Sequence, residues 1–273
     1  MTVRGVRFHV TEAGPLDGRP VLALHGWPQH HWVYRDLLAD PPPGMRIIAP
    51  DLPGYGWSGP PPHRWAKEDV VSDLVALMDA LGLDRVLLVG HDWGGYIGHL
   101  LTLRVPERIE GYLVLNMAHP WVPPKVLARH AWRFLLYQPL IAIAGVPVQR
   151  RTGFLDRVYR SASEIDPQTA RVYTERFRDP VVARTARDTY RTFLFHEVAA
   201  GVRTGEQRRS TVPTRVLFGK DDSAVAPALA AAETARADDY TVEVVEGGHF
   251  IADEQPELVR AKLISLAEET ATT

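Results

Sequence analysis

Short apolar segments alternate with longer amphipathic ones along the first half of this chain, and this alternation limits what the chain can fold into. Apolar residues recur at helical spacing over Lys67–Leu81. The β-rich apolar runs around this segment, each ending in turn residues, cover 21–26, 46–54, 85–90 and 111–117. Strands that alternate with helices are typical of parallel βαβ units, in which helices cover both faces of one sheet. The pattern therefore predicts an α/β fold with a mostly parallel central sheet.

The alternation stops near residue 118 and returns near residue 212. Between these positions the sequence has helical patterns with Arg-rich faces and no strand-like run. Strand-like runs then follow at 211–222 and 240–249, with an Ala-rich helical pattern between them, and a closing helix is expected from Pro256 to about Ala267. We therefore expect a split core with an inserted all-helical cap: core residues 1–118 and 212–273, and cap residues 119–211.

The composition excludes several classes of protein. The 273 residues are 45% hydrophobic and 23% charged, as in an ordinary globular protein with a full core. The 31 Lys and Arg nearly balance the 33 Asp and Glu, so no overall field selects nucleic acid or an anionic membrane. There is no cysteine, which excludes disulfides, thiolate metal sites and a Cys nucleophile. No signal peptide or spanning segment is apparent, so we expect a cytoplasmic protein without nucleic-acid or membrane partners. The oligomeric state stays open.

The sequence VGHDWGG at 89–95 places a carboxylate where a strand turns sharply into a helix. A nucleophile elbow, G-x-S-x-G, presents a serine at this point, but here Asp92 takes the central position and no G-x-S-x-G occurs in the chain. The N–H groups and dipole of the following helix favour negative charge, so we expect Asp92 to be ionised and exposed. A carboxylate attacks amides and esters poorly, but it can attack a saturated carbon that carries a leaving group and form an alkyl ester.

Hydrolysis of such an ester requires a general base, an acid that orients the base, and an oxyanion hole. His249, directly after the last predicted strand, is the candidate base, although a locally satisfied loop histidine fits the same pattern. Asp222, at the end of the preceding strand, is the candidate orienting acid; Asp221 is its rival, and a helix-capping Asp is the structural alternative. The order nucleophile, acid, base along the chain matches that of the elbow fold, so three strand ends together predict a catalytic triad.

Two backbone N–H groups are candidates for the oxyanion hole. One belongs to Trp93, the residue after the nucleophile. The other belongs to Trp27 in the sequence HGWP, which follows the first apolar strand, where the fold has its other donor. A simple tight turn is the alternative interpretation of HGWP, since Gly and Pro punctuate turns generally.

Together these motifs resemble the α/β-hydrolase superfamily, and within it the soluble epoxide hydrolases and haloalkane dehalogenases. The resemblance extends through HGWPQ, DLPGYGWS, GHDWGG, GKDD and GGHFIADEQPE, in family order and spacing. It implies the α/β-hydrolase fold, a cis peptide at Trp27–Pro28, and a two-step reaction without a cofactor. In the first step Asp92 attacks carbon, and in the second His249 and Asp222 activate water for ester hydrolysis.

The two subfamilies differ in how they treat the leaving group. Opening an epoxide leaves an alkoxide that needs a proton, and epoxide hydrolases supply it from two cap tyrosines, which stay protonated because their pKa is near ~10. Tyr137 and Tyr190 resemble these tyrosines, although the family pattern N-W-Y-R reads D-T-Y-R at the second. Tyr159 and Tyr173 are the alternatives, and an ordinary packed ring with a hydrated hydroxyl is the structural interpretation of each.

A haloalkane dehalogenase instead cradles the halide with indole N–H groups or an Asn amide. Trp93 would be one donor; many dehalogenases have Asn where this chain has Trp27, and Trp121 or Trp132 from the cap would have to replace it. We therefore expect an epoxide hydrolase first, a dehalogenase second, and a non-catalytic ligand-binding protein third. The expected partners are water and a small hydrophobic substrate, with a substrate site lined by Trp27, Trp93, Trp121, Trp57 and Phe250.

No metal site is expected. Gln29, His30 and His31 are adjacent, but no carboxylate follows them at the helical spacing of metal ligands. Asp51 follows the second strand, and we expect it to fix its own loop.

Overall fold

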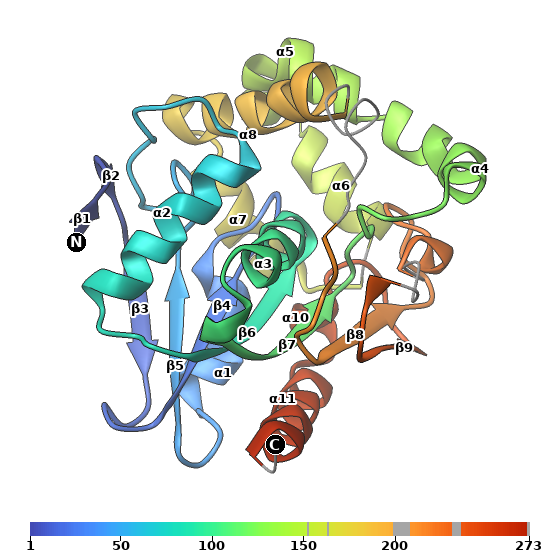
Figure 1. Cartoon of the computed structure of the whole chain (residues 1–273). Helices are drawn as coiled ribbons and strands as arrows, with labels where there is room; N and C mark the ends of the chain where they lie inside the picture. The colour runs from blue at the N-terminus through green and yellow to red at the C-terminus, as the bar shows by residue number, and fades with distance from the viewer. Residues whose placement is uncertain (152, 163, 199–207, 231–235, 272–273) are drawn as a thin grey trace.

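The computed structural model describes residues 1–151, 153–162, 164–198, 208–230 and 236–271. Seven strands form one sheet in the order β3-β5-β4-β6-β7-β8-β9 (Figure 1). All neighbouring strands pair in parallel except β3 and β5, which are antiparallel. The strands are β3 (Val10–Ala13), β4 (Arg19–Leu24), β5 (Met45–Pro50), β6 (Val86–His91), β7 (Ile109–Leu115), β8 (Thr214–Gly219) and β9 (Tyr240–Val245). The expected α/β class and mostly parallel sheet are confirmed.

The sheet is buried on both faces because its central strands are apolar at nearly every position. Successive residues of a strand point to opposite faces, and in β6 Leu88 packs into one core cluster while Leu87 and Val89 pack into the other. The same division holds in β4, where Leu22 and Leu24 lie in the first cluster. Continuous apolar runs of this kind are typical of parallel strands covered by helices.

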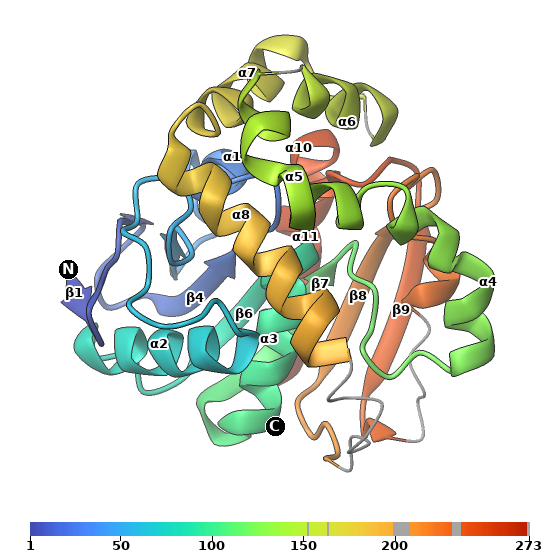
Figure 2. The same ribbon diagram turned by 90° about the horizontal axis from the view of Figure 1, so that it is seen from above.

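Helices cover both faces, as Figure 2 shows from above. The first cluster includes apolar residues of α2 (Lys67–Ala80) and α3 (Asp92–Arg104), and the second includes residues of α1 (Arg35–Ala39), α10 (Ile251–Glu254) and α11 (Pro256–Ala271). The predicted helix over Lys67–Leu81 is therefore α2, and the predicted closing helix is α11, which runs four residues further than expected.

A helical region lies between β7 and β8, at the end of the sheet where the parallel strands finish (Figure 1). Its elements are α4 (Pro124–Leu135), α5 (Gln138–Arg151), α6 (Phe154–Ala162), α7 (Pro167–Arg176), α8 (Pro180–Thr192) and the π-helical turn η3 (Phe193–Glu197). The expected helical insertion corresponds to this region. Its boundaries as a separate cap at 119–211 stay a prediction.

Some elements differ from the sequence-based expectation. Strand β3 was missed because its sequence VTEA has no apolar run, and a small separate sheet of β1 (Thr2–Val3) and β2 (Val6–Arg7) was missed as well. In the Ala-rich segment only the short 3₁₀ turn η4 (Pro227–Leu229) is described, and residues 231–235 lie outside the described residues. Two further 3₁₀ turns, η1 (His31–Tyr34) and η2 (Pro106–Arg108), join strands to helices.

Candidate active site

The turn between β6 and α3 presents Asp92 at the carboxyl end of a central strand. Strand β6 ends at His91, and α3 begins at Asp92, whose φ of 47° lies in the left-handed region. Glycine is needed beside it, because a Cβ on Gly94 would lie 2.3 Å from the carbonyl oxygen of Leu24. The strand–turn–helix pattern predicted from VGHDWGG therefore forms, with the carboxylate held above the edge of the sheet.

Burial and hydrogen bonding act in opposite directions on the charge of Asp92. The Trp27 backbone N–H donates to Asp92 Oδ2 at 2.9 Å, and the Trp93 backbone N–H is a second donor to this carboxylate. Burial raises the pKa of Asp92 to about 6, although the charge of His249 and the two N–H groups lower it. The expectation of an exposed Asp92 was wrong: the side chain is only partly exposed, and it ionises close to neutral pH.

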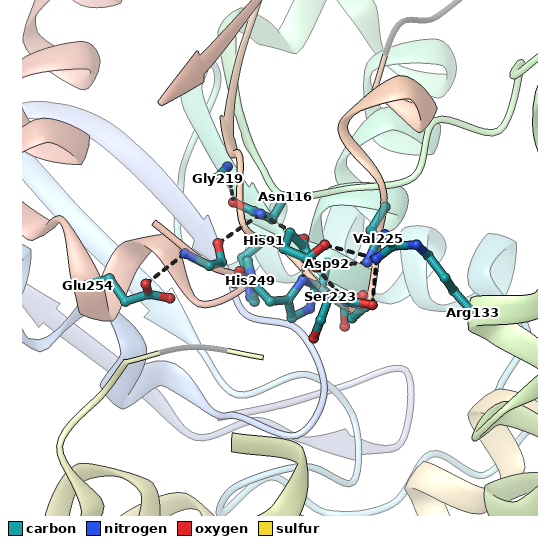
Figure 3. Close-up of polar contacts among 12 residues, drawn as sticks. His91, Asp92, Asn116, Arg133, Gly219, Ser223, Val225, His249 and Glu254 are labelled. Carbon is teal, nitrogen blue, oxygen red and sulfur yellow. Dashed lines mark hydrogen bonds and ion pairs between the residues drawn. The ribbon is translucent and has the colours of Figure 1, made fainter. Parts of the chain in front are cut away.

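His249 and Asp222 form a buried hydrogen-bonded pair, and Figure 3 shows His249 beside Asp92. The distance from His249 Nδ1 to Asp222 Oδ2 is 2.8 Å. Burial lowers the pKa of His249, but the hydrogen bond and charge of Asp222 and the charge of Asp92 raise it to about 8. Asp221, the rival orienting acid, is exposed and donates its backbone N–H to the carbonyl oxygen of Gly247. The structure therefore brings Asp222, and not Asp221, to the imidazole.

Asp222 is held in place by donors on both carboxylate oxygens. The backbone N–H groups of Ala224 and Val225 donate to Oδ1, each at 2.8 Å. Asn116 Nδ2 donates to Oδ2 at 2.8 Å, and the Asn116 Oδ1 accepts the N–H of Gly219 (Figure 3). Asn116 directly follows β7 and has a φ of 44°, so it turns back toward the neighbouring strand ends. Sequence analysis missed this residue, although an Asn after a buried strand was a usable signal.

The two loops that flank His249 are also fixed by hydrogen bonds. His91 Nε2 lies 2.9 Å from the carbonyl oxygen of His249, and the His249 N–H donates to the carbonyl oxygen of Ala162 in α6 at 2.7 Å. Glu254 accepts the N–H of Gly248 at 2.7 Å (Figure 3). His91 therefore joins the nucleophile turn to the loop that contains His249.

The turn after β4 holds the Trp27 N–H in line with Asp92. Its Trp27–Pro28 peptide bond is cis, as the resemblance implied. His25 fixes the turn, since its Nε2 accepts the N–H of Leu52 at 2.9 Å and its Nδ1 donates to the carbonyl oxygen of Gly26 at 3.0 Å. The Trp27 side chain points the other way, toward the helical region.

Tyr137 and Tyr190 of the helical region lie together over this turn. The Tyr137 ring stacks on Trp27 with centroids 5.9 Å apart, and the Tyr190 ring meets Trp27 edge-on at 5.5 Å. The two tyrosine rings are 6.0 Å apart. Burial raises the pKa of both phenols above the usual range, with the charge of Asp92 adding to the effect, so both stay protonated at neutral pH.

The alternative tyrosines are occupied elsewhere. The Tyr159 hydroxyl donates to the carbonyl oxygen of Pro28 at 3.0 Å, and the Tyr173 hydroxyl donates to Asp253 Oδ1 at 2.8 Å. Both rings belong to a different core cluster from Tyr190. Neither lines the cavity that contains Asp92.

The candidate catalytic groups share one cavity of about 450 Å³ between the sheet and the helical region. Asp92 and His249 lie on its core side, and Tyr137 and Tyr190 on its helical side. Most of its other described lining is apolar or aromatic, contributed by Trp27, Phe250, Phe154, Val158, Leu136 and Trp132. Trp27 and Phe250 thus lie where the predicted substrate site required them.

Three tryptophans predicted to line the substrate site do not reach this cavity. Trp57 is 43% exposed and packs against His30 with ring centroids 4.9 Å apart. Trp121 is buried against His99, 4.8 Å between ring centroids. The Trp93 indole is not among the described lining residues: its ring meets Tyr190 edge-on at 5.4 Å, and the ammonium of Lys67 lies 4.5 Å from its centroid. Neighbouring packing sets the direction of these three rings, and their role in substrate binding stays a prediction.

Lys67 is a buried cation that sequence analysis did not single out. Its Nζ forms an ion pair with Glu197 Oε2 at 2.6 Å and donates to the carbonyl oxygen of Thr189 at 3.1 Å. Burial lowers the pKa of Lys67 to about 8, against the raising effect of the charge of Glu197. Since Glu197 belongs to η3, this pair ties the first helix turn of α2 to the end of the helical region.

A second group of polar residues lies just past the carboxyl ends of β4 and β5. His31 Nδ1 is 2.9 Å from Asp51 Oδ1, and His9 Nδ1 is 3.1 Å from Asp51 Oδ2. The ligand atoms of the three residues lie within 4.8 Å of one another, a set that can accept a metal ion. The expectation of no metal site considered only carboxylates at helical spacing, whereas Asp51 reaches His31 from a strand end. Asp51 also accepts the N–H of Trp57 at 2.8 Å, so it fixes its loop as predicted.

The fold and the site geometry define the class of this protein. The chain belongs to the α/β-hydrolase fold family, whose family model matches residues 19–256. It is 26% identical to epoxide hydrolase 4 of Mus musculus over 294 residues, which cover 97% of this chain and 78% of that protein. It is 28% identical to haloalkane dehalogenase 2 of Mycobacterium tuberculosis (strain ATCC 25618 / H37Rv) over 265 residues, or 94% of this chain and 90% of that protein.

A solved structure gives the same result for the fold. The crystal structure of epoxide hydrolase VrEH1 from Vigna radiata matches with a TM-score of 0.77 at 24% identity, covering 98% of this chain and 96% of that chain. At this identity the likeness concerns the fold alone. The protein is an α/β hydrolase related at low identity to epoxide hydrolases and haloalkane dehalogenases.

Proposed function

We propose that this enzyme opens an epoxide to a vicinal diol through an ester on Asp92. Because Oδ2 of Asp92 accepts the Trp27 N–H, Oδ1 is the oxygen that attacks an epoxide carbon. The carbon–oxygen bond of the ring breaks, its electron pair passes to the ring oxygen, and that oxygen takes a proton from the phenol of Tyr190 or Tyr137. The product of this step is a hydroxyalkyl ester of Asp92.

Water then hydrolyses the ester. His249 Nε2 removes a proton from the water that attacks Cγ of Asp92, while Asp222 holds the Nδ1–H of the imidazole. The negative charge that forms on Oδ2 meets the N–H groups of Trp27 and Trp93. Breaking the bond between Cγ and Oδ1 releases the diol, and the two protons of the water end on the product oxygen and on the phenolate.

The main support for this proposal is that the nucleophile and the proton donors lie on opposite sides of one cavity. A carboxylate and its hydrolytic base lie on the core side, and two protonated phenols lie opposite them. A phenol with a raised pKa is a neutral donor that suits an oxygen on which charge develops. The apolar and aromatic walls support a small hydrophobic substrate.

Haloalkane dehalogenation is the second candidate, favoured by the similarity to haloalkane dehalogenase 2. A halide needs N–H donors that face the cavity. The Trp27 indole N–H already donates to Gln149 Oε1 at 2.9 Å, and the Trp93 side chain does not line the cavity. The tyrosine hydroxyls are better placed than either indole, which supports an epoxide over a haloalkane. A binding protein without turnover would not need the triad geometry.

The test is the intact mass of a His249→Gln variant after mixing with a small aromatic epoxide or, separately, with a chloroalkane. Without the base, the ester on Asp92 should persist. A gain equal to the whole epoxide is expected, and the double variant with Asp92→Asn should gain nothing from the same reagent. A gain equal to an alkyl group without its halogen would favour the dehalogenase. If neither reagent adds mass while the variant remains folded, the covalent mechanism is contradicted for these substrates.

A further inference from the structure

A long stretch of this chain carries positive charge without any acid, although the whole chain is nearly neutral. Between Glu110 and Asp156 the sequence contains no Asp or Glu. The basic residues in this stretch are Lys125, Arg129, Arg133, Arg150 and Arg151. It includes all of α4 and α5, so the outer helices of the helical region form a locally cationic surface.

The same two helices expose large apolar side chains. Hydrogen bonding continues through the junction of α4 and α5, since the Leu136 N–H donates to the carbonyl oxygen of Trp132 and the Ile141 N–H to that of Tyr137. The segment Pro124–Arg151 is long and apolar enough to cross a membrane by length and composition. Only 22% of its most apolar 18-residue part is buried in the protein. The exposed apolar side chains are Leu127, Trp132, Leu135, Leu136, Leu140 and Ile143.

In each helix, exposed residues recur at helical spacing. In α4 these are Lys125, Arg129 and Trp132, and at the junction and in α5 they are Leu136, Leu140 and Ile143. We call these six residues and the exposed Leu135 the α4–α5 stripe. The opposite side of α5 is buried and includes Ile141, Ala142 and Gly145, where it packs on α8. Figure 2 shows α5 beside α8, and α4 at the outer edge of the molecule. The exposed apolar side therefore faces away from the rest of the protein.

This surface adjoins the mouth of the active-site cavity. Trp132 and Leu136 belong both to the exposed stripe and to the cavity lining. Arg133 and Arg157 line the same cavity, and Asp92 is the only acid among its described lining residues. An apolar surface with cationic residues around it is thus continuous with the route into the cavity.

We propose that the α4–α5 stripe docks on the surface of an anionic phospholipid bilayer. Apolar side chains in the middle of a cationic helix bind the boundary between headgroups and acyl chains, while Lys and Arg reach the phosphates. The helix lies in the plane of the surface and does not cross it, because α5 buries Gln138 and Gln149 within the protein and basic residues stand near both of its ends. In this orientation the cavity mouth opens toward the bilayer. The sequence-based expectation of no membrane partner did not consider this local surface.

A second copy of the chain fits this surface less well. If two copies met through their α4–α5 stripes, basic residues at both ends of one stripe would face basic residues of the other. No acid of the same stretch is present to neutralise them. Anionic lipid headgroups supply the charge that this surface lacks.

The test is co-sedimentation of the whole protein with vesicles of phosphatidylcholine alone and of phosphatidylcholine mixed with phosphatidylglycerol. Binding to the mixed vesicles is expected, and it should weaken as salt is added. Lys125→Gln with Arg129→Gln should lower the partition coefficient about thirtyfold, because each basic residue near such a surface contributes about fivefold. Leu135→Gln with Ile143→Gln should lower it at least about tenfold, since these side chains are 68% and 73% exposed and free to insert.

Matched controls change the same chemistry on other faces. Leu16→Gln with Val244→Gln removes two exposed apolar side chains, and Lys220→Gln with Lys262→Gln removes two cations; neither pair should change vesicle binding. Circular dichroism and thermal melting check that all variants are folded. The proposal is overturned if no binding to mixed vesicles occurs at low salt, or if the stripe variants bind like their controls. It is also overturned if light scattering shows a dimer that the stripe variants dissociate. Vesicle binding is measured without turnover, so this result does not depend on the proposed reaction.

Discussion

The two sides of the cavity are built in different ways. On the core side, backbone groups fix the side chains: Asp222 accepts two backbone N–H groups and an Asn116 amide, and Asp92 accepts the Trp27 N–H. On the helical side, aromatic rings pack around Tyr137 and Tyr190, and the hydrogen bonds of their hydroxyls are with other side chains, Gln138 and Trp93 among them. Hydrogen bonds to strand-end loops specify a direction, whereas ring packing tolerates adjustment. Substitutions on the core side should therefore nearly abolish one chemical step of the proposed reaction. Substitutions on the helical side should slow a step without abolishing it.

The largest effect is expected from Asp222→Asn. This change removes the negative charge that orients and raises the pKa of His249, so ester hydrolysis should slow by about 10³-fold or more. Ester formation at Asp92 should persist, and rapid-quench mass spectrometry should show the ester accumulating.

Asp221→Asn is the matched control for this prediction. Asp221 is adjacent and exposed, and only its backbone N–H, which the variant keeps, has a described contact with the loop at Gly247. Its turnover should equal that of the unmodified enzyme. Equal losses in the two variants would contradict the assignment of Asp222 as the orienting acid.

Tyr190→Phe should have a smaller effect, confined to ring opening. The substitution keeps the ring that packs on Trp27 and removes one of two phenol donors, so epoxide opening should slow by about 10- to 100-fold while a bound ester hydrolyses at the normal rate. Stopped-flow fluorescence of the cavity tryptophans would separate the two steps. Tyr159→Phe is the control, because its hydroxyl bonds to Pro28 and does not line the cavity.

The sequence determined the core side of the site more completely than the helical side. Each motif at a strand end predicts both the catalytic side chain and its position, because parallel strands bring their carboxyl ends to one edge of the sheet. Asp92, Asp222 and His249 were therefore predictable together. Asp221 stayed a rival to Asp222 because the sequence offers two adjacent acids, and only the direction of the loop selects one.

Other features were beyond sequence reasoning for physical reasons. The directions of the Trp57, Trp93 and Trp121 rings depend on packing against partners that are distant in the chain. The raised pKa of Asp92 results from burial beneath the helical region, which a local motif does not report. Strand β3 lacks an apolar pattern because it is an edge strand with only partly buried residues.

The two chemical steps should differ in their pH dependence. Below the pKa that controls it, the rate of each step should rise about tenfold per pH unit. Ester formation requires ionised Asp92, so its rate should rise with pH and level off above a pKa of about 6. Ester hydrolysis requires neutral His249 and should level off at higher pH. Its pKa of about 8 applies while Asp92 is charged; the ester has lost that charge, so the inflection for hydrolysis should fall below 8. Single-turnover rates between pH 5 and pH 9 measure both, and coincident inflections near 6 for the two steps would contradict this assignment.

The smallest effects are expected at the Lys67–Glu197 ion pair, which joins α2 of the core to η3 of the helical region. Lys67 is 1% exposed and its partner's side chain is 22% exposed, so the two ends of the ion pair differ in how well water can replace a lost partner. Glu197→Gln leaves a buried ammonium and should destabilise the protein by about 3 kcal/mol, whereas Lys67→Met leaves a carboxylate that water can reach and should cost less than about 1 kcal/mol. Removing Glu197 also removes a charge that raises the pKa of Lys67, so the folded-state pKa should drop below about 8 while the unfolded value stays near ~10.5.

The sign of the pH effect follows from this difference. Between the two pKa values the unfolded chain binds more protons than the folded protein, so the stability of Glu197→Gln should rise with pH through this range, more than that of the unmodified protein. Urea denaturation at several pH values measures both effects. Equal destabilisation by the two substitutions, without this rise, would mean that the helical region is anchored by packing alone and that the buried charge contributes nothing to the junction.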